Sequence, residues 1–351
     1  GSVNVTGSTG DWVTNAANTY TGGTTLNAGS STAISLGSTG TAGSPTNGPF
    51  GAGTTPLVLN GGQVRSGTGG PFTIGNTVTL AANTTFHTTG SEKSLIFSGP
   101  VTITGATRTL TSEVGTTVAN TGVFFTAAIG DGGNALGITK AGLGNLTLGG
   151  ANTYTGGTSV NAGSLTLQGS VPTNTALSVS PNVAGGAAFS LASNSANPMT
   201  NVSALTIGSA TGPTALVMEL GASTALSDAI NTPNAATTSG TVNLSILPLA
   251  GFGSASTYDL LTASSGLNGA TYALINAPGG YSYSVVSSAT SLQLALTPVV
   301  GDLYWRGNTG SSWSTFTAGN TNWFTDAAGS TNAQSSPGAG NTVNFRTDNA
   351  P

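Results

Sequence analysis

Two short apolar triplets constrain the fold of this chain more than any other feature. Leu146-Thr147-Leu148 and Leu165-Thr166-Leu167 each place two leucines on one face of a strand and a threonine on the other. Both leucine positions recur at one fixed interval, and Gly-Gly, Asn-Thr-Tyr and Asn-Ala-Gly, all turn-forming, lie between them. A chain that returns to one apolar pattern after several turns is most simply coiled into a solenoid. The repeat therefore predicts a β-helix with one coil per period.

The segment between the triplets also occurs near the N-terminus. Residues 17–30 read ANTYTGGTTLNAGS and residues 151–164 read ANTYTGGTSVNAGS, so only two positions differ. Duplication is the economical explanation. The shared residues to which we assign structural roles are Asn18, Tyr20, Gly22, Gly23, Asn27 and Gly29 in the first copy, and Asn152, Tyr154, Gly156, Gly157, Asn161 and Gly163 in the second.

These residues resemble the autotransporter-associated β-strand repeat, also called the passenger-associated transport repeat, of large exported bacterial surface proteins. The resemblance rests on KAGLG at 140–144, the first leucine triplet, NTYTGGT at 152–158 and NAG at 161–163. It implies a right-handed parallel β-helix that is exported and displayed at the cell surface. It implies no enzyme activity.

The composition supports an all-β fold and excludes several functions. Charged residues are 5% of the chain, against about 25% in an average soluble domain, and glycine accounts for 54 of 351 residues. Helix-forming residues are therefore scarce, whereas strand and turn formers are abundant. Six basic residues give no cationic face for nucleic acid, and the absence of cysteine excludes disulfides and thiolate-metal sites. We predict no cofactor and no metal.

The N-terminal residues and the lengths of the apolar runs indicate whether the sequence contains a signal peptide or a membrane span. No apolar run approaches the roughly 18 residues of a membrane span, and Gly1-Ser2-Val3 does not begin a signal peptide. We therefore expect a processed chain or a fragment, with no membrane span. The expected localisation, extracellular or at the cell surface, comes from the family resemblance.

The strand pattern predicts three regions. Residues 1–240 read as the β-helix, with repeat copies at 17–30 and 146–167. Residues 241–300 have longer, more alternating and aromatic-bearing strands, which favour antiparallel pairing in a cap or a small sandwich. Such an end piece would cover the exposed edge of the last coil. Residues 301–351 form a Trp-rich terminal segment.

The terminal segment is expected either to close a unit of a longer tandem array or to dock on a neighbouring copy. In both cases Val343 and Phe345 would pair beside Val3 and Val5 of the next unit by strand addition. Trp305, Trp313 and Trp323 could stack on sugars as a carbohydrate platform, although packing in a core or an interface is favoured.

Catalytic chemistry finds little support in the sequence. Polysaccharide lyases and glycosidases on β-helices need carboxylates on adjacent coils, and only stacking could bring Glu92 near Glu113 or Asp131. His87 is the only histidine, and a turn or solvent-facing role is favoured over that of a base, a metal ligand or a pH switch.

The repeat residues also have a binding alternative. Asn18, Asn27, Asn152 and Asn161 could stack as an amide ladder, with a saccharide-binding row as the functional alternative. Tyr20 and Tyr154 share one repeat position, which favours a structural role.

The sequence thus predicts a non-catalytic structural protein of the bacterial exterior, a β-solenoid unit of a self-assembling fibre, a surface layer or an adhesin stalk. Its predicted partners are copies of itself. The alternatives are a carbohydrate-binding adhesin that contacts surface glycans and, less favoured, a polysaccharide-degrading enzyme.

Overall fold

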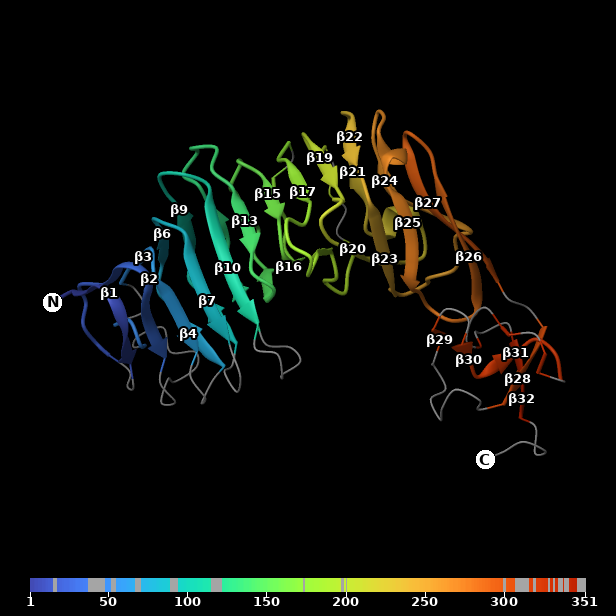
Figure 1. The fold of residues 1–351 in the computed structure, drawn as a ribbon, viewed down its shortest axis with the longest axis horizontal. Coiled ribbons are helices and arrows are strands. Elements are labelled where there is room, and N and C mark those ends of the chain that lie inside the picture. The colour runs from blue at the N-terminus through green and yellow to red at the C-terminus, as the bar shows by residue number, and fades with distance from the viewer. Residues whose placement is uncertain are drawn as a thin grey trace.

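A computed structural model describes residues 1–14, 18–36, 48–51, 55–66, 71–88, 94–114, 122–172, 174–196, 199, 201–298, 301–306, 316–317, 320–327, 329–330, 332–333, 337 and 341–345. This part of the chain is β-structure apart from two short 3-10 helices, η1 (Thr224–Leu226) and η2 (Leu267–Gly269). Figure 1 shows the strands side by side along the long axis of the molecule, which runs from the N-terminal to the C-terminal end. The predicted all-β class and the long parallel sheets are confirmed.

Parallel strands stack in three columns, which we call faces A, B and C. Two long strands begin the stack, β1 (Val3–Thr14) and β2 (Thr24–Leu36), and β2 pairs with face A through its first half and with face B through its second. Face A continues through β3 (Leu57–Asn60), β6 (Val78–Leu80), β9 (Val101–Ile103) and β12 (Ile129–Gly130). Face B continues through β4 (Gln63–Ser66), β7 (Thr84–Thr88), β10 (Arg108–Val114), β13 (Ile138–Ala141), β15 (Thr158–Val160), β17 (Leu177–Val179), β19 (Leu205–Ile207) and β22 (Ala236–Thr238). Face C comprises β5 (Phe72–Ile74), β8 (Leu95–Phe97), β11 (Val123–Phe125), β14 (Asn145–Leu148), β16 (Gly163–Leu167), β18 (Ala187–Ser190), β20 (Thr214–Leu220), β23 (Thr241–Pro248) and β25 (Thr271–Asn276).

The leucine triplets stack in register. Strands β14 and β16 are parallel, and Leu146 pairs with Leu165 and Leu148 with Leu167. All four leucines are buried, at 2% exposure or less. Burying a leucine side chain contributes about 1.5–3 kcal/mol, so each coil is held to the next by its inward residues and by the main-chain hydrogen bonds between strands.

Coil length varies while register is kept. Along face C, Phe72, Leu95, Val123, Leu146 and Leu165 pair in succession. Of these coils, the one from Leu95 to Val123 is the longest and the one from Leu146 to Leu165 is the shortest. The extra residues lie in the connections between strands, where insertions leave the stack intact.

The parallel stack extends beyond the boundary predicted at residue 240. Strand β23 pairs in parallel with β20, and β25 pairs in parallel with β23. The prediction that residues 241–300 pair antiparallel is therefore corrected for these strands. Alternation was a misleading signal, because any strand with one buried face and one solvent face alternates, whatever the direction of its neighbours.

Antiparallel pairing is confined to the end of the stack. Strand β24 (Thr257–Thr262) pairs in parallel with β21 (Ile230–Asn231), whereas β27 (Ser291–Pro298) pairs antiparallel with both β24 and β26 (Tyr281–Ser287). The side chains of β27 alternate between buried leucines and more exposed residues, so this sheet continues the same hydrophobic core.

The terminal segment forms a small sheet with a core of its own. Strand β28 (Gly301–Trp305) lies between β31 (Trp323–Phe324), which is antiparallel to it, and β32 (Asn341–Phe345), which is parallel. A separate hairpin joins β29 (Phe316–Thr317) to β30 (Asn320–Thr321). Figure 1 shows this segment to one side of the C-terminal end of the stack.

The small sheet pairs the predicted docking strand within its own chain. Val343 pairs with Leu303 and Phe345 with Trp305. Strand addition beside Val3 and Val5 of another copy stays a prediction. The sequence pattern identified a strand but not its partner, because the aromatic side chain of Trp323 packs against this sheet locally. Within the described residues, no helix is both long and apolar enough to cross a membrane.

Candidate functional site

Charged side chains gather on the outer surface of face B near the N-terminal end. In a chain with six basic and ten acidic residues, stacking brings Asp11, Arg65 and Glu113 onto one face together with the only histidine, His87. We call these four residues the charged column. Arg65, His87 and Glu113 are in register on β4, β7 and β10.

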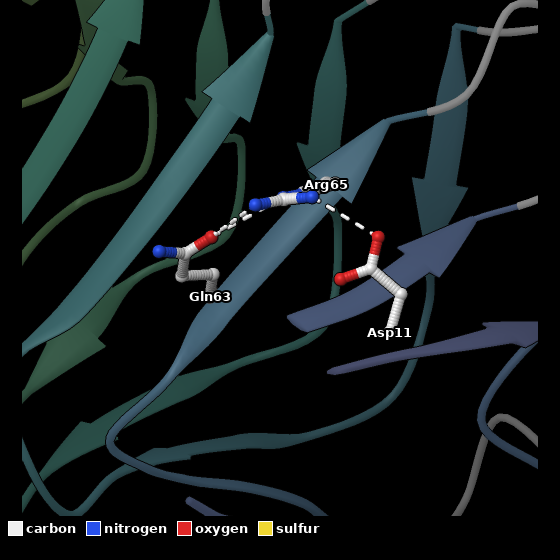
Figure 2. Close-up of polar contacts among 3 residues, drawn as sticks. All are labelled: Asp11, Gln63 and Arg65. Carbon is white, nitrogen blue, oxygen red and sulfur yellow. Dashed lines mark hydrogen bonds and ion pairs between the residues drawn. The ribbon is translucent and has the colours of Figure 1, made fainter. Parts of the chain in front are cut away.

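Arg65 connects the first coils. Its Nη1 donates to Asp11 Oδ2 at 3.0 Å, and its Nε and Nη2 donate to Gln63 Oε1 at 3.2 and 2.7 Å (Figure 2). The Arg65 and Asp11 side chains are 33% and 41% exposed, so solvent screens this ion pair and its contribution to stability is within about 1 kcal/mol.

The spacing of the column does not fit glycoside hydrolysis. Asp11 and Glu113 lie on β1 and β10, with β2, β4 and β7 between them. Four strand spacings of about 4.8 Å separate the two carboxylates by about 19 Å, whereas hydrolysis uses pairs about 5–9.5 Å apart. Asp131 follows β12 on face A, away from Glu113, and Glu92 lies outside the described residues. No group of three metal-ligating side chains forms within the described part of the chain.

A fully buried lysine lies beside this column. The Lys140 Nζ donates to the carbonyl oxygens of Ala141 at 2.9 Å, Gly142 at 2.6 Å and Ala162 at 3.0 Å. Burial lowers the pKa of Lys140 to about 7, and the negative charge of Glu113 opposes part of this shift. The ammonium group thus joins two successive coils through their turns.

Two buried carboxylates hold loops. Asp131 accepts hydrogen bonds from the backbone N–H groups of Gly133, Leu136 and Thr155 and from the Thr155 hydroxyl, at 2.8–3.1 Å. Burial alone would raise the pKa of Asp131, but these hydrogen bonds lower it to about 2. Glu219 accepts from the consecutive N–H groups of residues 193–195 at 2.9–3.2 Å. Both carboxylates therefore serve a structural role, because they accept hydrogen bonds from the loop backbone of the same chain.

The repeat tyrosines make the same contact in both copies. The Tyr154 hydroxyl is 2.6 Å from the Thr158 Oγ1, and Tyr20 bonds Thr24 in the same way. Tyr154 is fully buried, and its burial raises its pKa to about 12, with the Thr158 contact opposing part of the shift.

The repeat asparagines do not form one continuous ladder. Asn18 donates to the Pro49 carbonyl, whereas Asn152 donates to Gly150 and Ser170 and accepts from the Ile129 N–H. Asn27 accepts from Asn60 of the next coil at 2.8 Å. The backbone N–H of Asn161 donates to the Lys140 carbonyl.

The repeat glycines stand where coils approach closely. A Cβ on Gly22 would lie 2.4 Å from the Gly1 carbonyl, and one on Gly156 would lie 2.3 Å from Leu136. Gly23, Gly157 and Gly163 have positive φ angles of 82°, 96° and 64°, which favour glycine. Gly29 lies in β2 opposite the register shift of β1.

Trp323, of the terminal segment, packs inward. Trp323 is fully buried, and its ring centroid lies 4.9 Å from that of the half-buried Trp305 and 6.4 Å from that of the exposed Phe345. Trp313 lies outside the described residues. Trp323 therefore presents no face to a sugar.

Sequence reasoning missed the charged column and the burial of Lys140. The intervals from Arg65 to His87 and from His87 to Glu113 differ from each other and from that of the leucine repeat, so no single period places the column residues together. Lys140 had a usable signal, because it follows the buried Ile138 at an inward position of an alternating strand.

Comparison with known proteins agrees with the repeat pattern. The model of the passenger-associated transport repeat matches residues 9–30 and 138–167. Over 132 residues, 36% of this chain, the sequence is 37% identical to the adhesin BmaC autotransporter of Brucella suis biovar 1 (strain 1330). The match covers 4% of that relative, so this chain spans a small part of its length. The relative is an adhesin by name, and together with the repeat it identifies an exported, cell-surface protein.

Proposed function

Because the chain contains passenger-associated transport repeats and is exported to the cell surface, we propose that it is a non-catalytic, adhesin-like passenger segment whose β-solenoid acts as a rigid spacer. The observation that carries this proposal is the continuous parallel pairing of face C, which includes the Leu146–Leu165 pair and continues from β5 to β25.

The architecture suits a mechanical role. Nine strands on face C at about 4.8 Å spacing give a stack about 40 Å long, in which every strand between the ends is hydrogen-bonded on both sides. Bending or unfolding such a stack requires breaking main-chain bonds on faces B and C together, and also on face A as far as β12. The sheet of β24, β27 and β26 would act as the cap that covers the last coil.

Glycan binding is the second candidate function. The observation in its favour is the charged column, which places Arg65, His87 and Glu113 in register on adjacent strands of face B. The buried Trp323 argues against the tryptophan platform. The carboxylate spacing gives no support to polysaccharide degradation.

Removal of one whole coil tests the spacer role. Deletion of residues 146–164 joins Asn145 to Leu165, which takes the register position of Leu146. We expect this variant to fold, to shorten by about 4.8 Å in small-angle scattering and to keep its adhesion when displayed on bacteria. Deletion of residues 146–160 is the matched control, because it breaks the register and should unfold the stack.

Loss of adhesion by the folded, shortened variant would contradict the spacer role, because a spacer tolerates the removal of one layer. Binding of the isolated chain to a glycan array, abolished by Arg65→Ala, would favour the second candidate.

A further inference from the structure

Three Asn–Gly or Asp–Gly pairs lie wholly within the described residues. They are Asn60-Gly61, Asp131-Gly132 and Asn268-Gly269. Such pairs are chemically labile, because a glycine has no Cβ to hinder the attack of its backbone nitrogen on the preceding side-chain carbonyl carbon. Asparagine is therefore counted among the thermolabile residues. The fold places the three pairs in different surroundings, and these surroundings decide which pair reacts.

Hydrogen bonds hold the side chains of Asp131 and Asn60. Both carboxylate oxygens of the buried Asp131 accept hydrogen bonds from backbone N–H groups. Asn60 is the last residue of β3, which lies between β2 and β6, and its Nδ2 donates to Asn27 Oδ1 at 2.8 Å. Attack on either side chain requires these bonds to break first, so the fold protects both pairs.

The side chain of Asn268 lacks such a restraint. Asn268 lies in the one-turn helix η2, its side chain is exposed, and this side chain makes no hydrogen bond to another described residue. Gly269 is exposed as well. A single turn of 3-10 helix has poor hydrogen-bond geometry and opens readily, which frees the Gly269 nitrogen for attack.

We propose that Asn268 is a site of spontaneous deamidation, with water as the co-reactant. The Gly269 nitrogen loses its proton to hydroxide and attacks Asn268 Cγ, which closes a succinimide ring. The Cγ–Nδ2 bond breaks, and the amide nitrogen takes a proton from water and leaves as ammonia. Water then opens the ring. Cleavage of the new N–Cγ bond gives aspartate, whereas cleavage at the main-chain carbonyl gives isoaspartate, in which the backbone passes through the former side chain.

The surroundings of η2 give this reaction a structural consequence. Helix η2 lies against β22, the last strand of face B: Thr238 Oγ1 donates to the Gly266 carbonyl at 2.7 Å, and a Cβ on Gly269 would lie 2.3 Å from the Thr238 carbonyl oxygen. The N–H and the carbonyl of the buried Leu267 are also hydrogen-bonded. Both products add a negative charge to this segment, and isoaspartate also lengthens its backbone. Deamidation of Asn268 therefore loosens the C-terminal end of the stack.

Peptide mapping of the aged full chain tests the site. The chain is incubated folded and in urea, and chymotryptic peptides are weighed for the exchange of an amide for a hydroxyl; heavy-oxygen water in the digest marks any reaction that occurs during digestion. In the folded chain we expect Asn268 to react at least about tenfold faster than Asn60, where a hydrogen bond and the strand pairing must open first. The rate should rise about tenfold per pH unit, because hydroxide removes the proton. In urea the two residues should react at similar rates.

Asn268→Gln is the matched control variant. It keeps the exposed amide, but its longer side chain would have to close a larger ring, so it should not react over the same time. Circular dichroism establishes that the variant is folded. After equal incubation, the wild type should contain isoaspartate and unfold at a lower temperature than before, whereas the variant should be unchanged.

The rates and the unfolding temperatures decide between the outcomes. Equal rates at Asn60 and Asn268 in the folded chain, or no reaction at Asn268 under conditions in which the urea-unfolded chain reacts, would overturn the proposal. Equal unfolding temperatures of the aged wild type and the aged variant would overturn the effect on the end of the stack. This chemistry does not depend on the proposed function.

Discussion

At the scale of single residues, buried polar groups join neighbouring coils through backbone atoms. Lys140, Asp131 and Glu219 each bond main-chain groups of more than one residue, and Tyr154 bonds the Thr158 hydroxyl. A buried polar group without a partner costs about 1–3 kcal/mol, so these contacts determine which conformation each turn adopts. The charge states of Lys140 and Asp131 therefore couple stability to pH.

We predict that stability rises between pH 7 and pH 10 because of Lys140. Its pKa is about 7 in the folded chain and near 10.5 when exposed, so in this range the unfolded chain binds a proton that the folded chain does not. The free energy of unfolding then increases by up to about 1.4 kcal/mol per pH unit. Urea titrations at several pH values measure the slope, which Lys140→Met should remove. An unchanged slope in that variant would contradict the assignment.

Asp131 acts in the opposite pH range. Its folded pKa of about 2 lies below its ordinary value of 3.8, so its stabilisation is present above pH 4 and is lost as the pH falls toward 2. Asp131→Asn replaces one acceptor oxygen with a donor that faces N–H groups, and should cost about 2–3 kcal/mol at neutral pH by urea unfolding. Asp302→Asn, on the exposed Asp302, should change stability by less than about 0.5 kcal/mol.

At the scale of strands, the sequence predicted what depends on local alternation. The Leu-Thr-Leu triplets identified β14 and β16 and their pairing, because the short coil between them has no insertion. In the longer coils, such as the one from Leu95 to Val123, the same kind of pairing occurs. The additional loop residues change the sequence interval, so the pairing cannot be recognised from a fixed period. The charged column depends on the register of these longer coils, so local pattern could not reveal it. The partner of β32 lies in the separate sheet of the terminal segment, where Trp323 packs locally.

Inward and outward positions of one strand should respond differently to truncation. Leu165 is fully buried between Leu146 and Phe189, whereas Thr166 beside it is half-buried and faces outward. Leu165→Ala leaves a cavity and should cost about 2–5 kcal/mol, whereas Thr166→Ala should cost less than about 1 kcal/mol. Urea unfolding followed by circular dichroism measures both. Equal effects would mean that β16 does not present alternate faces to the core.

At the scale of the whole molecule, the stack and the terminal segment have separate hydrophobic cores. The large core extends from Leu26 to Leu296, and the small one contains Leu303, Trp323 and Ala333. A chain ending at residue 298 should therefore keep its strand signal and its unfolding midpoint. A chain ending at residue 250 loses β24, β25 and β27, which exposes the edge of β23 and should cause aggregation. Thermal unfolding with light scattering compares the two chains. Aggregation of the chain that ends at residue 298 would contradict the prediction, because it would show that the terminal segment protects the stack.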